Sequence, residues 1–330
     1  MVATADCGLR TEDRAQSMFR QALLRATSLP AVRRFITSDA AARQVALRFV
    51  AGETLDEGVD AVRRLNRQGF SASLDHLGEN TTNPAEARAA TADYVELLER
   101  IEAERLDANI SLKLTQLGLD LDEGQCAAHL EQIVGRAHSL GNLVRIDMES
   151  SEYVERTLRV FGRVYARYPL EVGAVVQSYL YRAERDVRAL IRLGARVRLV
   201  KGAYAEPPTV AFPRKRDVDG NYVRLMELLL LLARYPAIAT HDSAILRHAQ
   251  RFAARWSIAP DQYEFQMLYG IRRDLQTALR REGHRVRIYV PYGRAWYPYL
   301  TRRLAERSAN LIFLLQSVAR EAAQGLVRQH

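Results

Sequence analysis

Cysteine is nearly absent from the sequence: its 330 residues include only Cys7 and Cys126. Neither lies in a CxxC motif, so there is no disulfide framework. No apolar run approaches the ~18–20 residues that a membrane-spanning helix needs. The first thirty residues lack the basic and apolar segments of a signal peptide. These absences predict a protein of the reducing cytoplasm.

Acidic residues are outnumbered, because 48 Lys and Arg against 39 Asp and Glu give a net charge of +9. The arginines are nevertheless spread along helical segments and mixed with acids, as in RAERDVRALIRLGAR. No basic block of about 5–8 residues and no ribonucleoprotein or zinc-knuckle motif occurs. The charge indicates an arginine-rich solvated surface, and no nucleic-acid partner is predicted.

Several familiar site motifs are also missing. The sequence has no GxGxxG, GxxxxGK[ST], GxSxG or HExxH. Its seven histidines are not spaced as metal ligands, so no metal is predicted. Any cofactor must therefore be held without a Rossmann or P-loop device.

What the sequence does contain is a regular alternation of short apolar segments with amphipathic ones. The apolar segments read as buried strands, and they start about 25–40 residues apart with helical patterns between them. Eight such units predict a parallel (β/α)₈ barrel, with a doubly wound open sheet as the alternative. The predicted strands are 69–75, 109–114, 143–148, 173–180, 197–203, 237–242, 263–268 and 287–292.

Helical patterns also flank this alternation. Runs around 13–26, 31–50 and 55–68 predict an N-terminal helical segment, residues 1–65, that packs on a barrel domain of residues 66–330. One or two further helices are predicted after the last strand. Asn83 before Pro84 is a predicted helix start, and Gly141, Gly194 and Gly283 are predicted helix ends.

Polar residues gather where the predicted strands end, which is where barrel enzymes place their chemistry. Buried polar groups are costly unless they are paired, so a mere scaffold would not need them there. An enzyme or a small-molecule pocket is therefore favoured. The strand-end residues are Asp75, His76, Glu79, Lys113, Thr115, Gln116, Asp147, Glu149, Gln177, Tyr179, Lys201, Tyr204, Thr240, His241, Asp242, Gln266, Tyr289 and Tyr292.

The stretch VRLVKGAY (197–204) ends in one of only three lysines, the others being Lys113 and Lys215. Strand alternation places Arg198 and Lys201 on opposite faces, so only a bend near Gly202 or a broad ligand brings both to one partner. Gly202 also lets a flat or phosphorylated ligand approach the backbone. From the residues alone, three interpretations stay open: a Schiff-base lysine, a hydrolytic carboxylate pair, or a cofactor held across the barrel mouth.

A second informative stretch is PYLTRRLAE (298–306). On a helix, Tyr299, Arg302, Arg303 and Glu306 share a face. Two neighbouring guanidinium groups suit a carboxylate ligand, which each can grip through paired N–H bonds. A solvent-exposed arginine pair bonded to Glu306 is the alternative.

Taken together, nine motifs in this order resemble the proline dehydrogenase family, in its short monofunctional bacterial form. The resemblance runs from about residue 30 to 320. The motifs are SLDHLGE (73–79), SLKLTQLG (111–118), VRIDMES (144–150), VVQSY (175–179), VRLVKGAY (197–204), ATHD (239–242), EFQMLYG (264–270), RIYVPYG (287–293) and YLTRR (299–303).

The resemblance implies a distorted (βα)₈ TIM barrel with extra N-terminal helices and a C-terminal helix over the strand C-terminal face. It further implies non-covalent FAD, oxidation of L-proline to Δ1-pyrroline-5-carboxylate, and electron transfer to a membrane quinone. Residues implied at the proline pocket are Lys113, Asp147, Tyr204, Leu268, Tyr289, Tyr299, Arg302 and Arg303, with Asp147 and Tyr204 as catalytic residues. Residues implied along FAD are Met148, Gln177, Arg198, Lys201, Gly202, Ala203, Thr240, His241, Gln266 and Glu306.

Two departures from the family pattern concern the adenosine end of FAD. Ala205 stands where the bifunctional relatives commonly have a tryptophan, and Asp242 replaces the asparagine of a common THN motif. Peripheral contact with the inner face of the membrane is a further hypothesis, motivated by the basic surface and by LIFLL (311–315). The oligomeric state stays open.

Overall fold

The computed structural model describes residues 48–306. The chain divides into two units, one of Ala51–Arg294 and one of Met1–Val50 with Ala295–His330. The helix predicted over 13–26, most of the one predicted over 31–50, and LIFLL lie outside the described residues. The predicted boundary at residue 65 stays a prediction.

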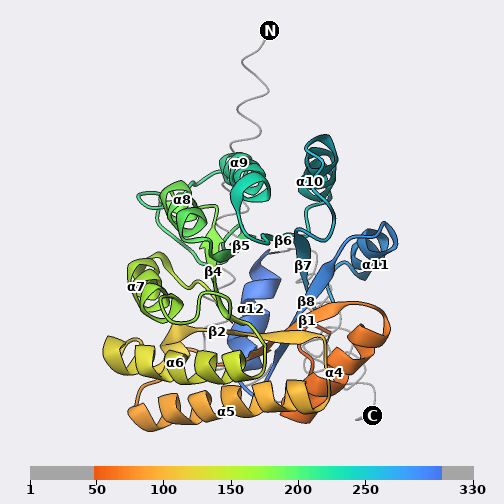
Figure 1. Ribbon diagram of the computed structural model, residues 1–330. Coiled ribbons are helices and arrows are strands. Elements are labelled where there is room, and N and C mark those ends of the chain that lie inside the picture. The colour runs from red at the N-terminus through yellow and green to blue at the C-terminus, as the bar shows by residue number, and fades with distance from the viewer. Residues whose placement is uncertain (1–47, 307–330) are drawn as a thin grey trace, which may run out of the picture. The chain divides into compact units, whose positions relative to one another are not determined.

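Eight parallel strands of the larger unit close into a barrel in sequence order, with β1 paired to β8 (Figure 1). The predicted barrel is confirmed, and the doubly wound open sheet is wrong. The strands are β1 (Ser71–His76), β2 (Ala108–Leu112), β3 (Val144–Ile146), β4 (Val172–Gln177), β5 (Arg196–Val200), β6 (Ala237–Ala239), β7 (Glu264–Leu268) and β8 (Val286–Tyr292).

Helices lie around the outside of this ring of strands (Figure 1). They begin and end where local chemistry predicts: the Asn83 side chain accepts from the N–H groups of Ala85 and Glu86, and Gly194 closes a helix in the left-handed region, with φ +73°. The helices are α5 (Pro84–Ala103), α6 (Glu123–Ser139), α7 (Val154–Tyr165), α8 (Ala183–Leu193), α9 (Lys215–Leu232), α10 (Ser243–Arg255) and α11 (Arg273–Arg281), with 3₁₀ turns η1 (Leu114–Leu117) and η2 (Ser151–Tyr153).

One further helix, α4 (Leu55–Arg67), precedes the first strand and packs against β1 and β8. A capping box fixes its start, because Thr54 and Glu57 each bond the other's backbone N–H. Gly58 allows a close approach, since a Cβ there would lie 3.0 Å from the ring of Tyr292. This helix thus covers the seam at which the barrel closes.

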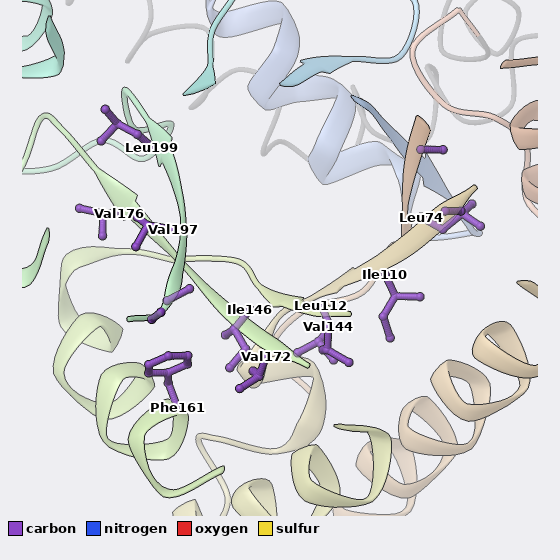
Figure 2. Close-up of a cluster of buried hydrophobic side chains, with 14 of the residues drawn as sticks. Leu74, Ile110, Leu112, Val144, Ile146, Phe161, Val172, Val176, Val197 and Leu199 are labelled. Atoms are coloured by element: carbon purple, nitrogen blue, oxygen red, sulfur yellow. The ribbon is translucent and has the colours of Figure 1, made fainter. Parts of the chain in front are cut away.

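The two faces of the strands differ in chemistry. Apolar side chains on the outer face pack against the helices, as Figure 2 shows for the part of the core that includes Phe161 of α7. The inner face is largely polar, although barrel interiors are usually filled by Val, Ile and Leu. Buried polar residues of the strands are Ser73, Asp75, Asn109, Ser111, Arg145, Gln177, Arg198, Glu264 and Gln266.

Most predicted strands run past the observed ends. The segment predicted over 197–203 stops at Val200, and the one predicted over 237–242 stops at Ala239. Lys201, Thr240 and His241 therefore lie in loops just beyond the strands. Among the described residues, no helix is long and apolar enough to cross a membrane.

Candidate active site

The inner-face residues at the carboxyl ends of the strands form the candidate site. Alternation sends Leu74, Ile110 and Leu199 outward to the helices and their neighbours inward. Asp75, Lys113 and Asp147 come from β1–β3 or their ends, and Arg198 and Tyr289 come from β5 and β8. The fold thus brings together polar side chains from Asp75 to Tyr289, which are about two hundred positions apart in the sequence.

A buried ion pair lies at the centre of this group. The Nη1 atom of Arg198 lies 2.6 Å from Oδ1 of Asp147, with 4% and 14% of their side chains exposed. The Tyr289 hydroxyl donates to Oδ2 of the same carboxylate at 2.7 Å. Arg198 also donates to Ser111 Oγ at 3.0 Å, and its guanidinium lies over the Tyr289 ring. Asp147 thus orients the Arg198 guanidinium and balances its charge.

A second carboxylate, Asp75, lies beside this pair. Its Oδ2 accepts from Lys113 Nζ at 3.4 Å, and its side chain is fully buried. Burial raises the pKa of Asp75 above its usual value, although Lys113 opposes the shift, and Asp147 adds to it. Burial likewise keeps the pKa of Tyr289 well above its usual value, with Asp147 and Asp75 contributing. Tyr289 therefore stays a hydrogen-bond donor at neutral pH.

Lys201 points the other way from Arg198, as strand alternation predicts. Its Nζ donates to Oδ1 of Asp219 in α9 at 2.6 Å and to Oδ2 of Asp242, the N-cap of α10, at 3.0 Å. Lys215 is exposed and also bonds Asp219. The ammonium group of Lys201 thus connects the carboxyl end of β5 to α9 and to the start of α10.

The loop that follows β5 is fixed by close backbone contacts. Gly202 has φ +118°, and a Cβ there would lie 2.5 Å from the ring of Tyr179. Tyr179 in turn donates its backbone N–H to the Lys201 carbonyl at 2.9 Å. The glycine is thus required both by its backbone conformation and by the neighbouring ring. Ala203 and Tyr204 are half-buried in this loop.

The other predicted cofactor residues of the larger unit lie at or just beyond the carboxyl ends of the strands. Gln177 donates to the Glu149 carbonyl at 2.8 Å, and His241 Nε2 accepts from the Leu268 N–H at 2.9 Å. Thr240 caps the turn into α10 through the Asp242 N–H at 3.1 Å. Met148 is buried among residues of β4 and α7, and Gln266 is buried on β7 beside Glu264.

Deeper in the barrel lies a basic layer that the sequence does not reveal. Arg145 is 1% exposed, and its Nη1 donates to the Arg196 carbonyl at 2.7 Å. Gly173 makes room for it, because a Cβ there would lie 2.5 Å from the guanidinium. Burial, followed by the charge of Arg198, lowers the pKa of Arg145 to about 9. Arg287 bonds both oxygens of Glu264 at 3.1 Å.

The helix predicted from PYLTRRLAE is present as α12 (Trp296–Glu306), in the smaller unit. Tyr299, Arg302, Arg303 and Glu306 therefore share a helical face. The side chains of Arg302, Arg303 and Glu306 lie outside the described residues. Their predicted place at the proline pocket and FAD, and that of the helix over the strand ends, stay predictions.

Several residues of the site are absent from the residues predicted to contact proline or FAD. Asp219 has no strand-end position, and only its spacing of four from Lys215 marks it as a salt-bridge partner. Glu149 accepts from the Thr115 hydroxyl at 2.6 Å, and burial raises its pKa. Arg145 has no sequence signal, because an arginine within a strand usually faces solvent.

A closed barrel whose strand ends gather carboxylates, cations, amides and tyrosines around one mouth defines a class of protein, the (β/α)₈ enzymes. A profile of the proline dehydrogenase family matches residues 59–316. The chain is 42% identical over 276 residues to proline dehydrogenase 1 of Bacillus subtilis (strain 168), covering 84% of this chain and 91% of that one. It is 40% identical over 309 residues to proline dehydrogenase of Deinococcus radiodurans, covering 91% and 98%.

Among solved structures, proline utilization A (PutA) from Bdellovibrio bacteriovorus, inactivated by N-propargylglycine, matches with a TM-score of 0.76 and 25% identity. That match covers 91% of this chain but 37% of the PutA chain, so the chain spans about a third of that protein. The chain belongs to the proline dehydrogenase family, and the activity supported by this membership is the oxidation of proline. The resemblance seen in the sequence is confirmed.

Proposed function

We propose that this protein oxidises L-proline to Δ1-pyrroline-5-carboxylate with non-covalently bound FAD, by hydride transfer from the C5 atom of proline, and that the electrons pass to a quinone. This reaction is the first step of proline breakdown toward glutamate. The observation that carries the proposal is the Asp147–Arg198–Tyr289 group, with Arg198 buried and the other two half-buried, in a barrel of this family.

The residues present fit a flavin. Arg198 is buried, and its Nε has no hydrogen-bond partner among the described residues, so a donor remains for a ligand at the mouth. FAD carries a flat ring system and a diphosphate, which call for donors, amides and a close backbone approach. Residues that would hold it are Met148, Gln177, Arg198, Lys201, Gly202, Ala203, Thr240, His241, Gln266 and Glu306. When bound, FAD supplies the hydride acceptor that no amino-acid side chain offers.

The chain's own residues then bind and orient proline. Arg302 and Arg303 are proposed to grip its carboxylate through paired N–H bonds, with Lys113 adding positive charge. Tyr204, Leu268, Tyr289 and Tyr299 are proposed to enclose the ring and exclude water. Asp147 holds Arg198 and Tyr289 in fixed positions, which supports an orientation effect more than acid–base catalysis.

An absorbance spectrum of the pure protein, recorded before and after anaerobic addition of L-proline, tests cofactor and substrate together. We expect flavin bands that bleach with proline. Colourless protein that gains no flavin bands on incubation with FAD would contradict the cofactor, and bands that persist with excess proline would contradict the reaction.

The acceptor needs its own measurement. The rate of proline-dependent reduction of a short-chain quinone should be comparable to the rate with an artificial dye.

Flotation with anionic lipid vesicles tests peripheral membrane contact. Protein left wholly in the soluble fraction would count against such contact.

A further inference from the structure

Four side chains at the end of β5 form a compact charged group, here called the Lys201 cluster: Lys201, Lys215, Asp219 and Asp242. Lys201 Nζ lies 2.6 Å from Asp219 Oδ1 and 3.0 Å from Asp242 Oδ2. Lys215 bonds Asp219 and lies 3.9 Å from Asp242. Three elements therefore meet at one point: the strand end, the first turn and a half of α9, and the start of α10.

Asp242 contributes to this cluster with each of its oxygens in a different role. Its Oδ1 accepts from the N–H groups of Ala244 and Ile245 at 3.0 and 3.5 Å, which caps α10, while its Oδ2 bonds Lys201. Burial by itself would raise the pKa of Asp242, but the bonds from Lys201 and from the helix N–H groups hold it below its usual value. The carboxylate is therefore ionised at neutral pH.

The cluster is electrically balanced, because two ammonium groups face two carboxylates. Side-chain exposures of 27%, 25% and 26% for Lys201, Asp219 and Asp242 make the charges only partly screened by water. Lys201 is proposed to lie along FAD, and an anionic group of FAD that approaches it would meet two carboxylates within hydrogen-bond distance of the same Nζ atom. Lys201 and Lys215 attract such an anion and the two carboxylates repel it, so removal of one carboxylate leaves a net attraction.

We propose that Asp219 and Asp242 hold Lys201 in position and at the same time limit the affinity of the protein for FAD, a role that rests on the proposed use of FAD. Either carboxylate alone suffices to anchor the ammonium, because the two bonds come from separate elements. Removing one negative charge then leaves Lys201 in place and relieves a repulsion, so FAD binding becomes tighter.

The decisive variant is Asp242→Asn, since asparagine caps a helix as well as aspartate does but carries no charge. The dissociation constant of FAD is measured on the flavin-free full chain by quenching of flavin fluorescence. We expect this dissociation constant to fall by roughly three- to tenfold, as for removal of one partly screened negative charge near an anionic ligand. The difference between the dissociation constants of Asp242→Asn and the wild type should become smaller at high salt, because salt screens the charge of Asp242.

Asp219→Asn provides an independent second variant and should tighten binding in the same direction. Asp217→Asn is the matched control: it removes a charge from the same turn of α9, but Asp217 bonds Arg214 at 2.6 Å, not Lys201. Its dissociation constant should equal that of the wild type. The melting temperature of each flavin-free variant reports damage to the fold.

The sign of the effect separates the proposal from a purely structural role. A structural role lowers the melting temperature and weakens FAD binding. Unchanged or weaker binding in both Asp242→Asn and Asp219→Asn, with Asp217→Asn at the wild-type value, would overturn the proposal. If the wild-type chain itself binds no FAD, the proposed function fails; if it binds FAD and only the tightening is missing, this inference alone fails.

Discussion

Replacing Asp147 by alanine perturbs the best-defined electrostatic group of the barrel. In the described part of the chain, Asp147 is the carboxylate that pairs with Arg198, whose side chain is only 4% exposed. After the change, Arg198 keeps the hydroxyls of Ser111 and Ser73, at 3.0 and 3.4 Å, neither of which carries a charge. Tyr289 also loses the acceptor at 2.7 Å.

The expected loss of stability follows from these contacts. Removing one partner of a buried ion pair costs about 3–5 kcal/mol, because the remaining charge stays buried without a counter-ion. Loss of the hydrogen bond from Tyr289 costs about 1 kcal/mol. Part of this cost is already included in the range for the broken ion pair. We therefore expect the free energy of unfolding to fall by about 4 kcal/mol, a large fraction of the ~5–15 kcal/mol typical of a domain.

Equilibrium unfolding of the flavin-free full chain in urea measures this loss. Tyr289→Phe should cost about 1 kcal/mol, since it removes one hydrogen bond. Glu123→Ala is the matched control, because it breaks a surface ion pair. Glu123 lies 2.8 Å from Arg159, whose side chain is 51% exposed. The free energy of unfolding should change little in this variant.

A double variant tests the physical reason. Combining Asp147→Ala with Arg198→Met removes both charges, so we expect it to be more stable than Asp147→Ala alone. A loss for Asp147→Ala no greater than that for Glu123→Ala would refute the reasoning.

Three further predictions concern single positions. Gly202→Ala places a Cβ 2.5 Å from the Tyr179 ring at φ +118°, so it should lower both the melting temperature and the flavin content. Gly283→Ala is the control, because φ there is +87° and nothing lies within 4 Å of the added Cβ. Equal effects of the two substitutions would contradict this prediction. Lys201→Arg should lower flavin content, because a broad guanidinium replaces an ammonium held by two carboxylates, whereas the exposed Lys215→Arg should not; unchanged flavin content and kcat would refute the first. Burial raises the pKa of Cys126 to about 12 from 9.0, so in a Cys7→Ser background the native thiol should resist a maleimide at pH 8 and react once unfolded; rapid native labelling would count against its burial. Because the thiolate is disfavoured only in the folded state, the stability from this group is complete below about pH 9 and is lost as pH rises toward 12.

The eight strands could be predicted because parallel barrel strands are buried on both faces. Segments such as NISL and VGAVV carry enough apolar and small residues to be recognised without any knowledge of the fold. Their alternation with helices left two topologies, a closed barrel and a doubly wound open sheet, and the pairing of β1 with β8 decides for the barrel. Helix ends at Asn83 and Gly194 were equally accessible, since their signals are local.

The ends of the strands were harder to predict, because the residues that follow a strand and form the site are often as apolar as the strand itself. The predicted strand over 173–180 includes Tyr179 and Leu180, yet β4 ends at Gln177. Tyr179 lies in a turn, and Leu180 forms an isolated antiparallel bridge with Ala211. Contacts between distant elements were not accessible at all. Nothing local marks Asp219 as a partner of Lys201, or Gly173 as the space for Arg145.

The scarcity of lysine in this chain acquires a physical meaning at Lys201. Alternation along β5 sends Arg198 into the barrel, where its fork reaches Asp147, Ser111 and Ser73 at once. Lys201 turns toward the helices and receives two carboxylates around a single nitrogen, at 2.6 and 3.0 Å. A planar guanidinium distributes its donors over a wide edge and suits the first environment, whereas a compact ammonium suits the second. Because one strand thus presents two cations of different shape to two different sets of acids, exchanging them should disable both positions even though the net charge is unchanged.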